Sequence, residues 1–438
     1  MTIWLERWLP WVLAAVSAIA YSVLSLKRFA EFTVTSWDLA IFQQAVKGYS
    51  QFEAPIVPVK GPGFNILGDH FSPIYAVLAP IYRVFPHAQT LLIAQAVLVG
   101  VSVGIIAALA IRHLGLVGAW IGVLYALSFG IQEGVAADFH EVAFALPFLA
   151  LAGSAYVDGR FDKVMAWSLP LVLVKEDMGI TVAAVGLALW LVGERTRGTF
   201  LAVLGVVATV VTVVIIIPSF NAGDAYEYTG TLGGDAGVVS TFFTGLDTKA
   251  TTLLVTFGIT GLFALLSPWA LVAVPTLLWR FVGDVEFYWG TQWHYSMVLM
   301  PIVFVALIDT IAQRERTKWP ALALATAVST WTFLGSPLTT LVGEEDAFVA
   351  NRAKDAETAM TYLPKGTYVE SDLGLLSHLV SDHTVYWRGT VADAIPDYIV
   401  FDRSYSDDDI VGYAWEAHGR EYRVIHDSGQ FVVAERTR

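Results

Sequence analysis

The stretch 164–193, VMAWSLPLVLVKEDMGITVAAVGLALWLVG, decides the fold, because it is apolar along its length except at Lys175-Glu176-Asp177. A helix needs about 20 apolar residues to span a bilayer. The stretch is therefore two short helices broken at the charges or one re-entrant pair, and irregular backbone at that depth must be covered by protein or a water-filled cavity. Three charges at the break are costly unless they are paired. The stretch thus predicts a membrane protein with a polar site near one membrane surface.

The composition of the whole chain supports this reading. Of 438 residues, 56% are hydrophobic and only 15% are charged, whereas a soluble protein carries about 25% charged residues. The net charge of −13 excludes the basic stripe that nucleic-acid binding needs. The chain has no cysteine, which excludes disulfides, thiol nucleophiles and cysteine-based metal sites.

The apolar segments predict about eleven spans of a polytopic α-helical membrane protein. The first has no small-residue cleavage site before Lys27-Arg28, so we interpret it as a retained span and not as a signal peptide. The segments lie near residues 8–26, 88–111, 114–130, 142–157, 164–175, 178–193, 199–218, 250–266, 269–281, 295–311 and 320–341.

Basic residues fall in alternate loops, and cytoplasmic loops collect Lys and Arg. This rule places the N-terminus in the cytoplasm and predicts a multi-pass protein of the cytoplasmic membrane. The basic residues that define the inner loops are Arg7, Arg112, Arg160, Lys163, Arg195, Arg197, Arg314, Arg316 and Lys318. The outer segments are then 27–87, 131–141, 176–177, 219–249, 282–294 and everything after 342.

Five short charged clusters all fall on the predicted outer side. Ionisable groups at membrane depth are costly, so such clusters are candidates for a functional site. The outer cations Lys60, Arg83, Lys175 and Arg280 depart from the charge rule and are candidates for anion binding. The five clusters are Trp37-Asp38, Gly68-Asp69-His70, Asp138-Phe139-His140-Glu141, Lys175-Glu176-Asp177 and Trp293-His294-Tyr295.

The chain divides into two predicted domains. Residues 1–343 form the membrane domain, whose long first outer loop, 27–87, contains helical patterns and is expected to be structured. Residues 344–438 change composition sharply and predict a small extracytoplasmic α/β domain. Its expected elements are strands at 367–370, 384–387 and 397–401, helices at 373–380 and 408–418, and a hairpin of 422–425 with 430–434.

The order of these motifs resembles a domain-of-unknown-function family of bacterial and archaeal polytopic membrane proteins. The resemblance covers nearly the whole chain, and the set of motifs is specific although each piece is weak. It rests on Trp37-Asp38 with Gln43, Gly68-Asp69-His70-Phe71-Ser72-Pro73, Gln95, Asp138-Phe139-His140-Glu141, Lys175-Glu176-Asp177 with Gly179, and His294-Tyr295.

The layout also resembles the GT-C superfamily of glycosyltransferases. Its members have many spans, an acidic residue early in a long first outer loop, and often a soluble outer C-terminal domain. They transfer a sugar from a polyprenyl-phosphate carrier to an acceptor outside the membrane. This second resemblance is architectural, and a fold by itself does not establish a function.

The resemblance places the catalytic base at Asp38, because transfer to a hydroxyl needs a carboxylate that accepts the hydroxyl proton. The alternative is that Asp38 is a helix N-terminal carboxylate favoured by the macrodipole. Asp69 and His70 would bind acceptor hydroxyls or join a metal site; otherwise they belong to a loop turn.

Asp138, His140 and Glu141 combine three potential ligands, and Asp138 is also a candidate catalytic residue. Carboxylates suit magnesium or manganese, and imidazole with carboxylate suits zinc or manganese. Some GT-C enzymes hold the donor phosphate with a divalent ion and others need none. The alternative is a polar turn that caps the following helix.

For the lipid phosphate, Lys175 is the first candidate, with Glu176 and Asp177 beside it, followed by Arg280 and His294. An interfacial arginine can also merely snorkel, with its stem along apolar surface and its charged head in water.

The aromatic residues Phe287-Tyr288-Trp289 suit a membrane-boundary belt or a sugar-stacking platform. The glycine-rich loop 219–249, with Asp224, Tyr226, Glu227 and Tyr228, could cover a bound substrate.

These observations lead to the hypothesis of a membrane glycosyltransferase. It would use a polyprenyl-phosphate sugar and an envelope glycan, glycolipid or protein acceptor, with Asp38 as base and inversion at the anomeric carbon. One alternative is a transporter or lipid flippase, which predicts charges near mid-bilayer. Another is a non-catalytic envelope assembly protein whose tail binds wall polymers.

Overall fold

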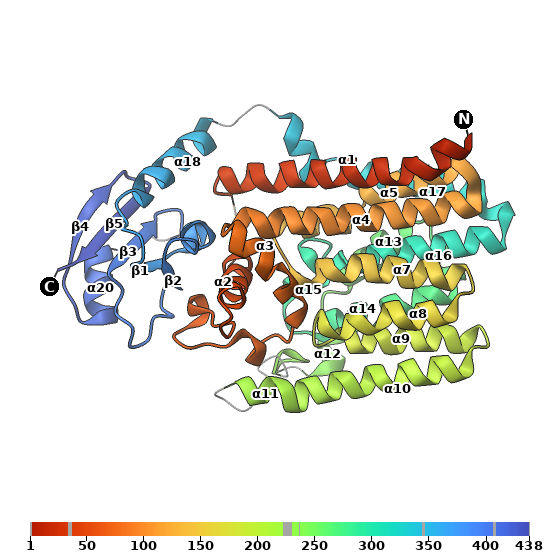
Figure 1. Ribbon diagram of the computed structural model, residues 1–438, viewed down its shortest axis with the longest axis horizontal. Helices are drawn as coiled ribbons and strands as arrows, with labels where there is room; N and C mark the ends of the chain where they lie inside the picture. Colours follow the sequence, from red (N-terminus) through yellow and green to blue (C-terminus); the bar gives the residue numbers. More distant parts are fainter. Residues whose placement is uncertain are drawn as a thin grey trace.

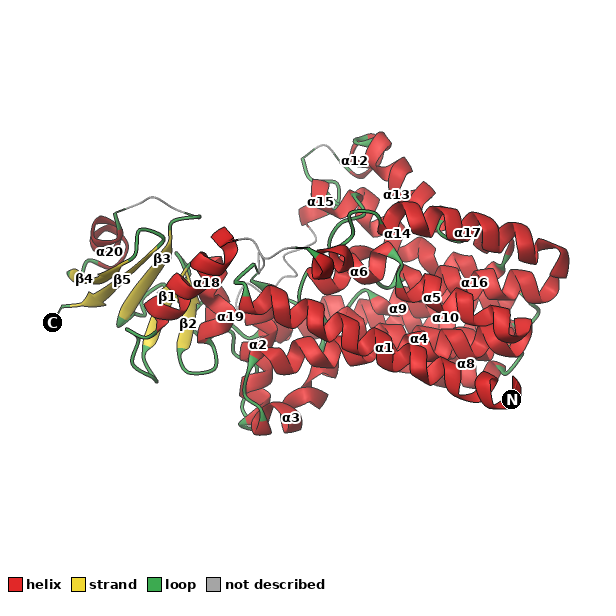
Figure 2. Ribbon diagram, turned by 90° about the horizontal axis from the view of Figure 1, so that it is seen from above, coloured by secondary structure: helices red, strands yellow, loops and turns green. Residues whose placement is uncertain are grey.

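The computed structural model describes residues 2–33, 37–221, 230–235, 237–343, 347–405 and 409–437. A bundle of helices occupies most of the molecule, and a small sheet with its own helices lies beyond one end of the bundle (Figure 1). The same division is seen after a quarter turn (Figure 2). The predicted combination of an apolar helical domain and a C-terminal α/β domain is therefore confirmed as architecture.

The centre of the bundle is α16 (Leu299–Gln313), which is buried on all sides from Leu299 to Ile311. Helix α1 (Thr2–Ala30) packs along α4 (Ala88–Leu114), and α4 packs against α7 (Ala145–Val157) and α16. The other bundle helices are α5 (Gly118–Ala126), α6 (Phe129–Ala136), α8 (Phe161–Ser168), α9 (Met178–Leu191), α10 (Arg195–Val211), α11 (Ile217–Phe220), α12 (Val238–Phe243), α13 (Leu246–Gly258), α14 (Val274–Val282), α15 (Glu286–Trp289) and α17 (Lys318–Phe333).

The expected number of about eleven spans is not confirmed by helix length. Within the described residues, three helical stretches are long and apolar enough to cross a membrane: Trp4–Ala30, Ala88–Ala136 and Arg195–Phe220. A fourth is possible if Glu286–Ser296 and Leu299–Gln313, bent by 69°, count as one span. The reason is local: several predicted spans consist of a short apolar helix next to a 3-10 segment. Helix α8 continues into the proline-containing Leu169–Leu173, for example, and Glu141–Phe144 precedes α7.

The segment 164–193 is broken at its charges, as expected. Helix α8 and the 3-10 turn end at Leu173, and α9 begins at Met178 after the three charged residues. The first outer loop is also structured. It contains α2 (Asp38–Ser50), α3 (Ala79–Val84) and the 3-10 turns Pro58–Lys60, Ile66–Gly68 and Pro73–Leu78.

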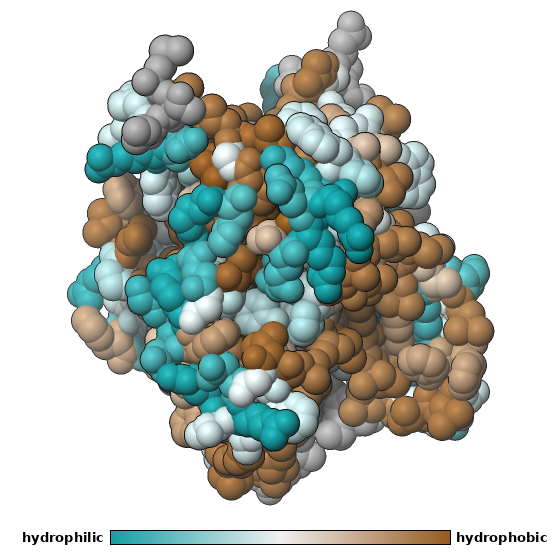
Figure 3. Space-filling view, turned by 90° about the vertical axis from the view of Figure 1, so that its right-hand side faces the viewer, coloured by the Kyte–Doolittle hydropathy of each residue, from teal (hydrophilic) through white to brown (hydrophobic). Residues whose placement is uncertain are grey.

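The basic loops gather at the end of the bundle that is opposite the sheet. Hydrophilic side chains cover much of this end (Figure 3). Here Asp158 accepts from Arg112 at 3.1 Å and contacts His113 at 2.9 Å, and Arg197 donates to Asp162 at 2.8 Å. The two ends of the bundle therefore differ in the way that the charge rule predicts.

The C-terminal sheet has the strand order β2-β1-β3-β5-β4. Strands β1 (Tyr368–Ser371), β2 (Thr384–Trp387) and β3 (Tyr398–Asp402) are parallel, whereas β5 (Phe431–Arg436) runs antiparallel to β3 and β4 (Tyr422–Asp427). The predicted strands and the predicted hairpin are confirmed. The helices expected at 373–380 and 408–418 correspond to α19 (Leu376–Leu379) and α20 (Ile410–His418). Helix α18 (Ala347–Met360), which packs against β5, was not predicted.

The sheet domain is docked on α2 through buried polar side chains. Lys47 donates to the carbonyls of Val380 at 2.6 Å and His383 at 3.3 Å, and burial lowers its pKa. Gln44 donates to the Val385 carbonyl at 2.8 Å and accepts from the Val59 amide at 3.0 Å. These contacts bind carbonyls between the end of α19 and the middle of β2, so α2 is held against the sheet domain.

The end of α1 makes a second contact with the sheet domain. The imidazole of His378 stacks between Phe29 and Phe32, with ring centroids 3.8 and 3.9 Å apart. Arg352 donates to the Phe32 carbonyl at 2.7 Å and pairs with Asp402 at the end of β3. The tail therefore packs on the membrane domain at two places.

The predicted sidedness can be tested with introduced thiols, because the native chain has none. Asp393→Cys lies at an exposed site of the sheet domain and Lys163→Cys at an exposed site of the basic end. A membrane-impermeant maleimide added to intact cells should label Asp393→Cys alone, and permeabilised cells should show labelling of both. Labelling of Lys163→Cys alone in intact cells would reverse the topology.

The close pairing of α9 and α10 gives a second prediction. A Cβ at Gly205 would lie 2.2 Å from the Gly179 carbonyl oxygen, so the helices must separate in Gly205→Ala. Overpacking of this kind costs about 1–3 kcal/mol, and thermal unfolding in detergent should show a lower Tm. The control is Gly258→Ala on α13, where the nearest atom would be Val328 Cγ1 at 3.8 Å. An unchanged Tm for Gly205→Ala would contradict the packing.

Candidate active site

The charged clusters from different segments of the chain converge at the end of the bundle that faces the sheet domain. Ion pairs and ring contacts join them directly. Asp38 lies beside His140, which stacks on His294; Lys175 pairs with Glu141; and His70 pairs with Glu176. The structure therefore brings all five clusters together, although they are as far apart as residues 37 and 295 in the sequence.

Asp38 is the first residue of α2 and directly follows Trp37. Ser36, which precedes Trp37, lies outside the described residues. The Asp38 carboxylate is 34% exposed, and its Oδ2 lies 3.4 Å from Nε2 of the buried His140. Burial opposes the imidazolium form, but Asp38 raises the pKa of His140. The Asp38 carboxylate is therefore partly exposed and lies against a buried histidine.

His140 and His294 stack with ring centroids 3.6 Å apart and planes inclined by 24°. Burial and the neighbouring His140 lower the pKa of His294 well below its usual value. Two imidazolium rings in contact would repel each other, so a neutral His294 can lie against a protonated His140. The pair extends from Asp38 toward α14 and α16.

Gln95 of α4 fixes the backbone around Asp138. Its amide donates to the Asp138 carbonyl at 2.7 Å, and its oxygen accepts from the His140 amide at 2.8 Å. Asp138 has a φ of 69°, a left-handed conformation that costs about 1–2 kcal/mol for a residue with a Cβ. Burial raises the pKa of the Asp138 carboxyl to about 7. The bidentate contact of Gln95 stabilises this strained turn and so places His140 against Asp38.

Two buried carboxylates pair with the cations of the site. Lys175 Nζ lies 3.2 Å from Glu141 Oε1, and His70 Nδ1 lies 2.9 Å from Glu176 Oε1. Glu176 also accepts from the Phe71 amide at 3.2 Å. Burial opposes ionisation of Glu176, but His70 holds its pKa down at about 2, and Glu176 in turn raises the pKa of His70. The pairs cancel much of the charge that the site buries.

Three other predicted binding residues are less central. Lys60 pairs with Asp69 and lies over the Phe64 ring at 5.1 Å. Arg83 lies over the Phe52 ring at 5.1 Å and donates to the Ser50 carbonyl at the end of α2. Lys60 thus contacts Asp69, the residue before His70. Arg83 lies at the end of α2 that is opposite Asp38.

Arg280 is fully buried, and its guanidinium is occupied by the loop that follows α14. It donates to the carbonyls of Tyr288 at 2.7 Å and Gly290, and to Ser296 Oγ at 3.2 Å. This geometry favours a structural role, and a phosphate contact from Arg280, which stays a prediction, would require the loop to move.

The predicted metal ligands Asp138, His140 and Glu141 do not fit a metal in this arrangement. Among the described residues, no group of three or more His, Asp or Glu side chains is placed to hold an ion. His140 is directed to Asp38 and His294, whereas Glu141 is directed to Lys175. A divalent metal therefore stays a prediction from the resemblance, and no step below depends on it.

A small cavity of about 20 Å³ adjoins Lys175. The sequence singled out Lys175, Asp177, His294 and Tyr295 but gave no signal for the threonine and tryptophan that line the same cavity from α14. The lining residues are Val142, Lys175, Asp177, Met178, Thr276, Trp279, His294, Tyr295 and Val298. Only the fold brings α14 against the start of α9.

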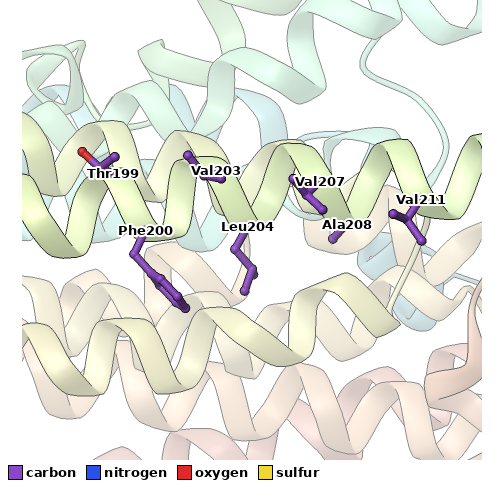
Figure 4. A pocket seen from close by; sticks show the side chains of 7 residues that line it. All are labelled: Thr199, Phe200, Val203, Leu204, Val207, Ala208 and Val211. Atoms are coloured by element: carbon purple, nitrogen blue, oxygen red, sulfur yellow. The ribbon is translucent and has the colours of Figure 1, made fainter.

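A larger hollow of about 630 Å³ lies along the exposed face of α10, far from this chemistry. It is lined by Thr199, Phe200, Val203, Leu204, Val207, Ala208 and Val211, which follow one face of the helix (Figure 4). It contains no ionisable group, so we interpret it as a surface for lipid chains and not as a reaction site. Residues Asp224, Tyr226, Glu227 and Tyr228 of the possible covering loop lie outside the described residues.

Comparisons with known proteins agree with the motifs. The family described as "Predicted membrane protein (DUF2079)" matches residues 28–408. No match was found among the curated proteins. Among solved structures, ArnT from Cupriavidus metallidurans bound to undecaprenyl phosphate has a TM-score of 0.58 at 12% identity, over 97% of each chain. At this identity the similarity shows a shared fold over nearly the whole of both chains, which agrees with the expected architecture.

The His70–Glu176 pair predicts a pH-dependent stability. Glu176 has a folded pKa near 2, so it contributes folding stability at pH values above the ordinary carboxyl pKa of 4.5. His70 has a raised pKa, so it contributes folding stability below its ordinary pKa of 6.5. That contribution is lost as the pH rises through the raised pKa of His70. Glu176→Gln should therefore cost about 1–3 kcal/mol between pH 4.5 and 6.5 and progressively less toward pH 10.

Thermal unfolding of wild type and Glu176→Gln from pH 5 to pH 10 measures this difference. Glu53→Gln, an exposed change in the same outer loop, is the control and should follow the wild type. A Tm difference that is constant with pH would show that the pair does not titrate as described.

Proposed function

This chain belongs to the family of predicted membrane proteins described as DUF2079, and we propose that it is a membrane glycosyltransferase that uses a polyprenyl-phosphate sugar. The acceptor would be an envelope glycan, glycolipid or protein outside the cytoplasmic membrane. The observation that carries the proposal is the placement of Asp38. It stands partly exposed at the start of α2, against buried His140, whose chain neighbour Glu141 pairs with Lys175, in a fold like that of ArnT.

The first chemical requirement is a base for the acceptor. Asp38 would accept the proton of the acceptor hydroxyl while the hydroxyl oxygen attacks the anomeric carbon of the donor. His140, at 3.4 Å, orients the carboxylate and stabilises its ionised form, since an opposite charge lowers a carboxyl pKa. The buried Asp138 is the second carboxyl of the site, and its turn positions His140.

The second requirement is stabilisation of the leaving group. As the bond between the anomeric carbon and the phosphate oxygen breaks, negative charge develops on the polyprenyl phosphate. Lys175, which lines the small cavity and pairs with Glu141, is the first candidate cation and would exchange Glu141 for the phosphate; a fixed cation at developing charge lowers the barrier. The neighbouring His70–Glu176 pair and Lys60 with Asp69 would hold the surrounding segments in place. Direct displacement inverts the anomeric carbon.

The undecaprenyl phosphate bound to ArnT supports the proposed class of lipid carrier for this chain. The sugar and the acceptor are open within that class. A requirement for magnesium or manganese can be decided by comparing transfer with and without EDTA. The flippase and assembly alternatives would leave Asp38 without a chemical role, which makes this residue the point of decision.

Asp38→Asn tests the proposal, because it keeps the size of the side chain and removes the base. We expect transfer from a panel of polyprenyl-phosphate sugars by the purified protein to fall about 10²- to 10⁴-fold, while thermal unfolding reports a loss of no more than about 1 kcal/mol from the helix macrodipole. Full activity in Asp38→Asn would exclude Asp38 as base.

The matched control is Asp247→Asn, which changes the acidic residue in the first turn of α13. It removes a similar interaction with a helix macrodipole, worth about 0.3–1 kcal/mol, at a distance from the site. Equal losses of activity in the two variants would mean that Asp38 acts through helix stability and not through chemistry.

A further inference from the structure

We propose that the small cavity beside Lys175 is a subsite for one hydroxyl group of the sugar that is transferred. The inference rests on the proposed function and adds a specificity pocket to it. The pocket is formed where α9, α14 and the 3-10 turn His294–Ser296 meet.

Four residues that line this cavity carry a buried polar atom without a hydrogen-bond partner among the described residues. The atoms are Asp177 Oδ1, Thr276 Oγ1, Trp279 Nε1 and His294 Nδ1. Thr276 is only 2% exposed, so solvent outside the protein does not reach its hydroxyl. An unsatisfied buried polar group costs about 1–3 kcal/mol, and four around one cavity indicate a place for a polar ligand atom.

The size of the cavity limits what it can hold. Its volume of about 20 Å³ is just above the 10–15 Å³ or so that a single water needs. A whole sugar ring does not fit, but one hydroxyl projecting from a ring does. Before the donor binds, a water can satisfy the same atoms, and the sugar hydroxyl would displace it while reproducing its hydrogen bonds.

The lining groups select a hydroxyl over other groups of similar size. The indole N–H of Trp279 only donates, the Asp177 carboxylate accepts, and the Thr276 hydroxyl does both. Burial raises the pKa of Asp177 to about 6, so the carboxyl is mainly ionised at neutral pH. An anion would be repelled and a methyl group would leave the polar atoms unpaired, whereas a sugar hydroxyl can accept and donate at once.

The pocket is also in the right place for a donor sugar. Its wall includes Lys175, the proposed phosphate contact, and His294, which stacks on the His140 that faces Asp38. A sugar ring between Lys175 and Asp38 would therefore pass the mouth of the cavity. The Trp279 and Tyr295 rings, whose centroids are 6.0 Å apart, add apolar surface of the kind that contacts sugar rings.

Thr276→Val tests the subsite, because it removes the hydroxyl and keeps the shape of the side chain. The full-length protein in detergent is titrated with undecaprenyl phosphate and with a panel of undecaprenyl-phosphate hexoses and pentoses. Wild type should prefer at least one sugar-bearing lipid. For that lipid, Thr276→Val should raise Kd about three- to tenfold and leave Kd for undecaprenyl phosphate unchanged. Trp279→Phe should have the same selective effect.

The control is Thr256→Val on α13. It also removes a fully buried hydroxyl that has no hydrogen-bond partner in the described part of the chain, but Thr256 does not line the cavity. It should change neither Kd. If Thr276→Val and Trp279→Phe keep the full sugar preference, or weaken both lipids equally, the subsite is wrong and the glycosyltransferase proposal stands. If wild type prefers no sugar-bearing lipid, both proposals fall together.

Discussion

The cost of burying ionised groups is the constraint on which the rest of this structure depends. A carboxylate or ammonium group loses several kcal/mol of hydration when it is removed from water, and only a close partner offsets the loss. Glu141 and Glu176 are nearly fully buried, and each has a cation from another segment at 2.9–3.2 Å. The segments around 70, 140 and 175 must therefore meet for any of them to be stable.

The same constraint explains why the soluble part of the chain packs on the membrane part. Helix α2 carries Asp38 at one end, with the buried Gln44 and the half-buried Lys47 further along. Among the described residues, these two side chains hydrogen-bond to the sheet domain and to the first outer loop. The position of α2, and with it that of the candidate base Asp38, is thus fixed by the sheet domain and by the first outer loop. The domain beyond the bundle therefore supports the helix that carries the candidate base.

Several side chains that the sequence grouped by type have separate tasks in space. Asp138, His140 and Glu141 are neighbours in the chain, but His140 faces Asp38 and His294 whereas Glu141 faces Lys175, so they are not placed as a metal site among the described residues. Arg280 is a fully buried cation and Lys175 a partly buried one at the end that faces the sheet domain, yet Arg280 is committed to backbone carbonyls whereas Lys175 lines a cavity. Charge type alone does not distinguish these roles, because orientation depends on the backbone.

The sequence by itself determined the apolar helical class, the end at which the charges gather, and most elements of the C-terminal sheet domain, because hydrophobic periodicity and turn residues are local properties. It also singled out Asp38 and Lys175 by their position at helix breaks. Only the tertiary structure decided that His140 stacks on His294, that Gln95 holds the strained turn at Asp138, and that Thr276 and Trp279 join the site. Those contacts link residues more than forty positions apart, and they form because buried polar groups must find partners wherever the packing of helices brings them.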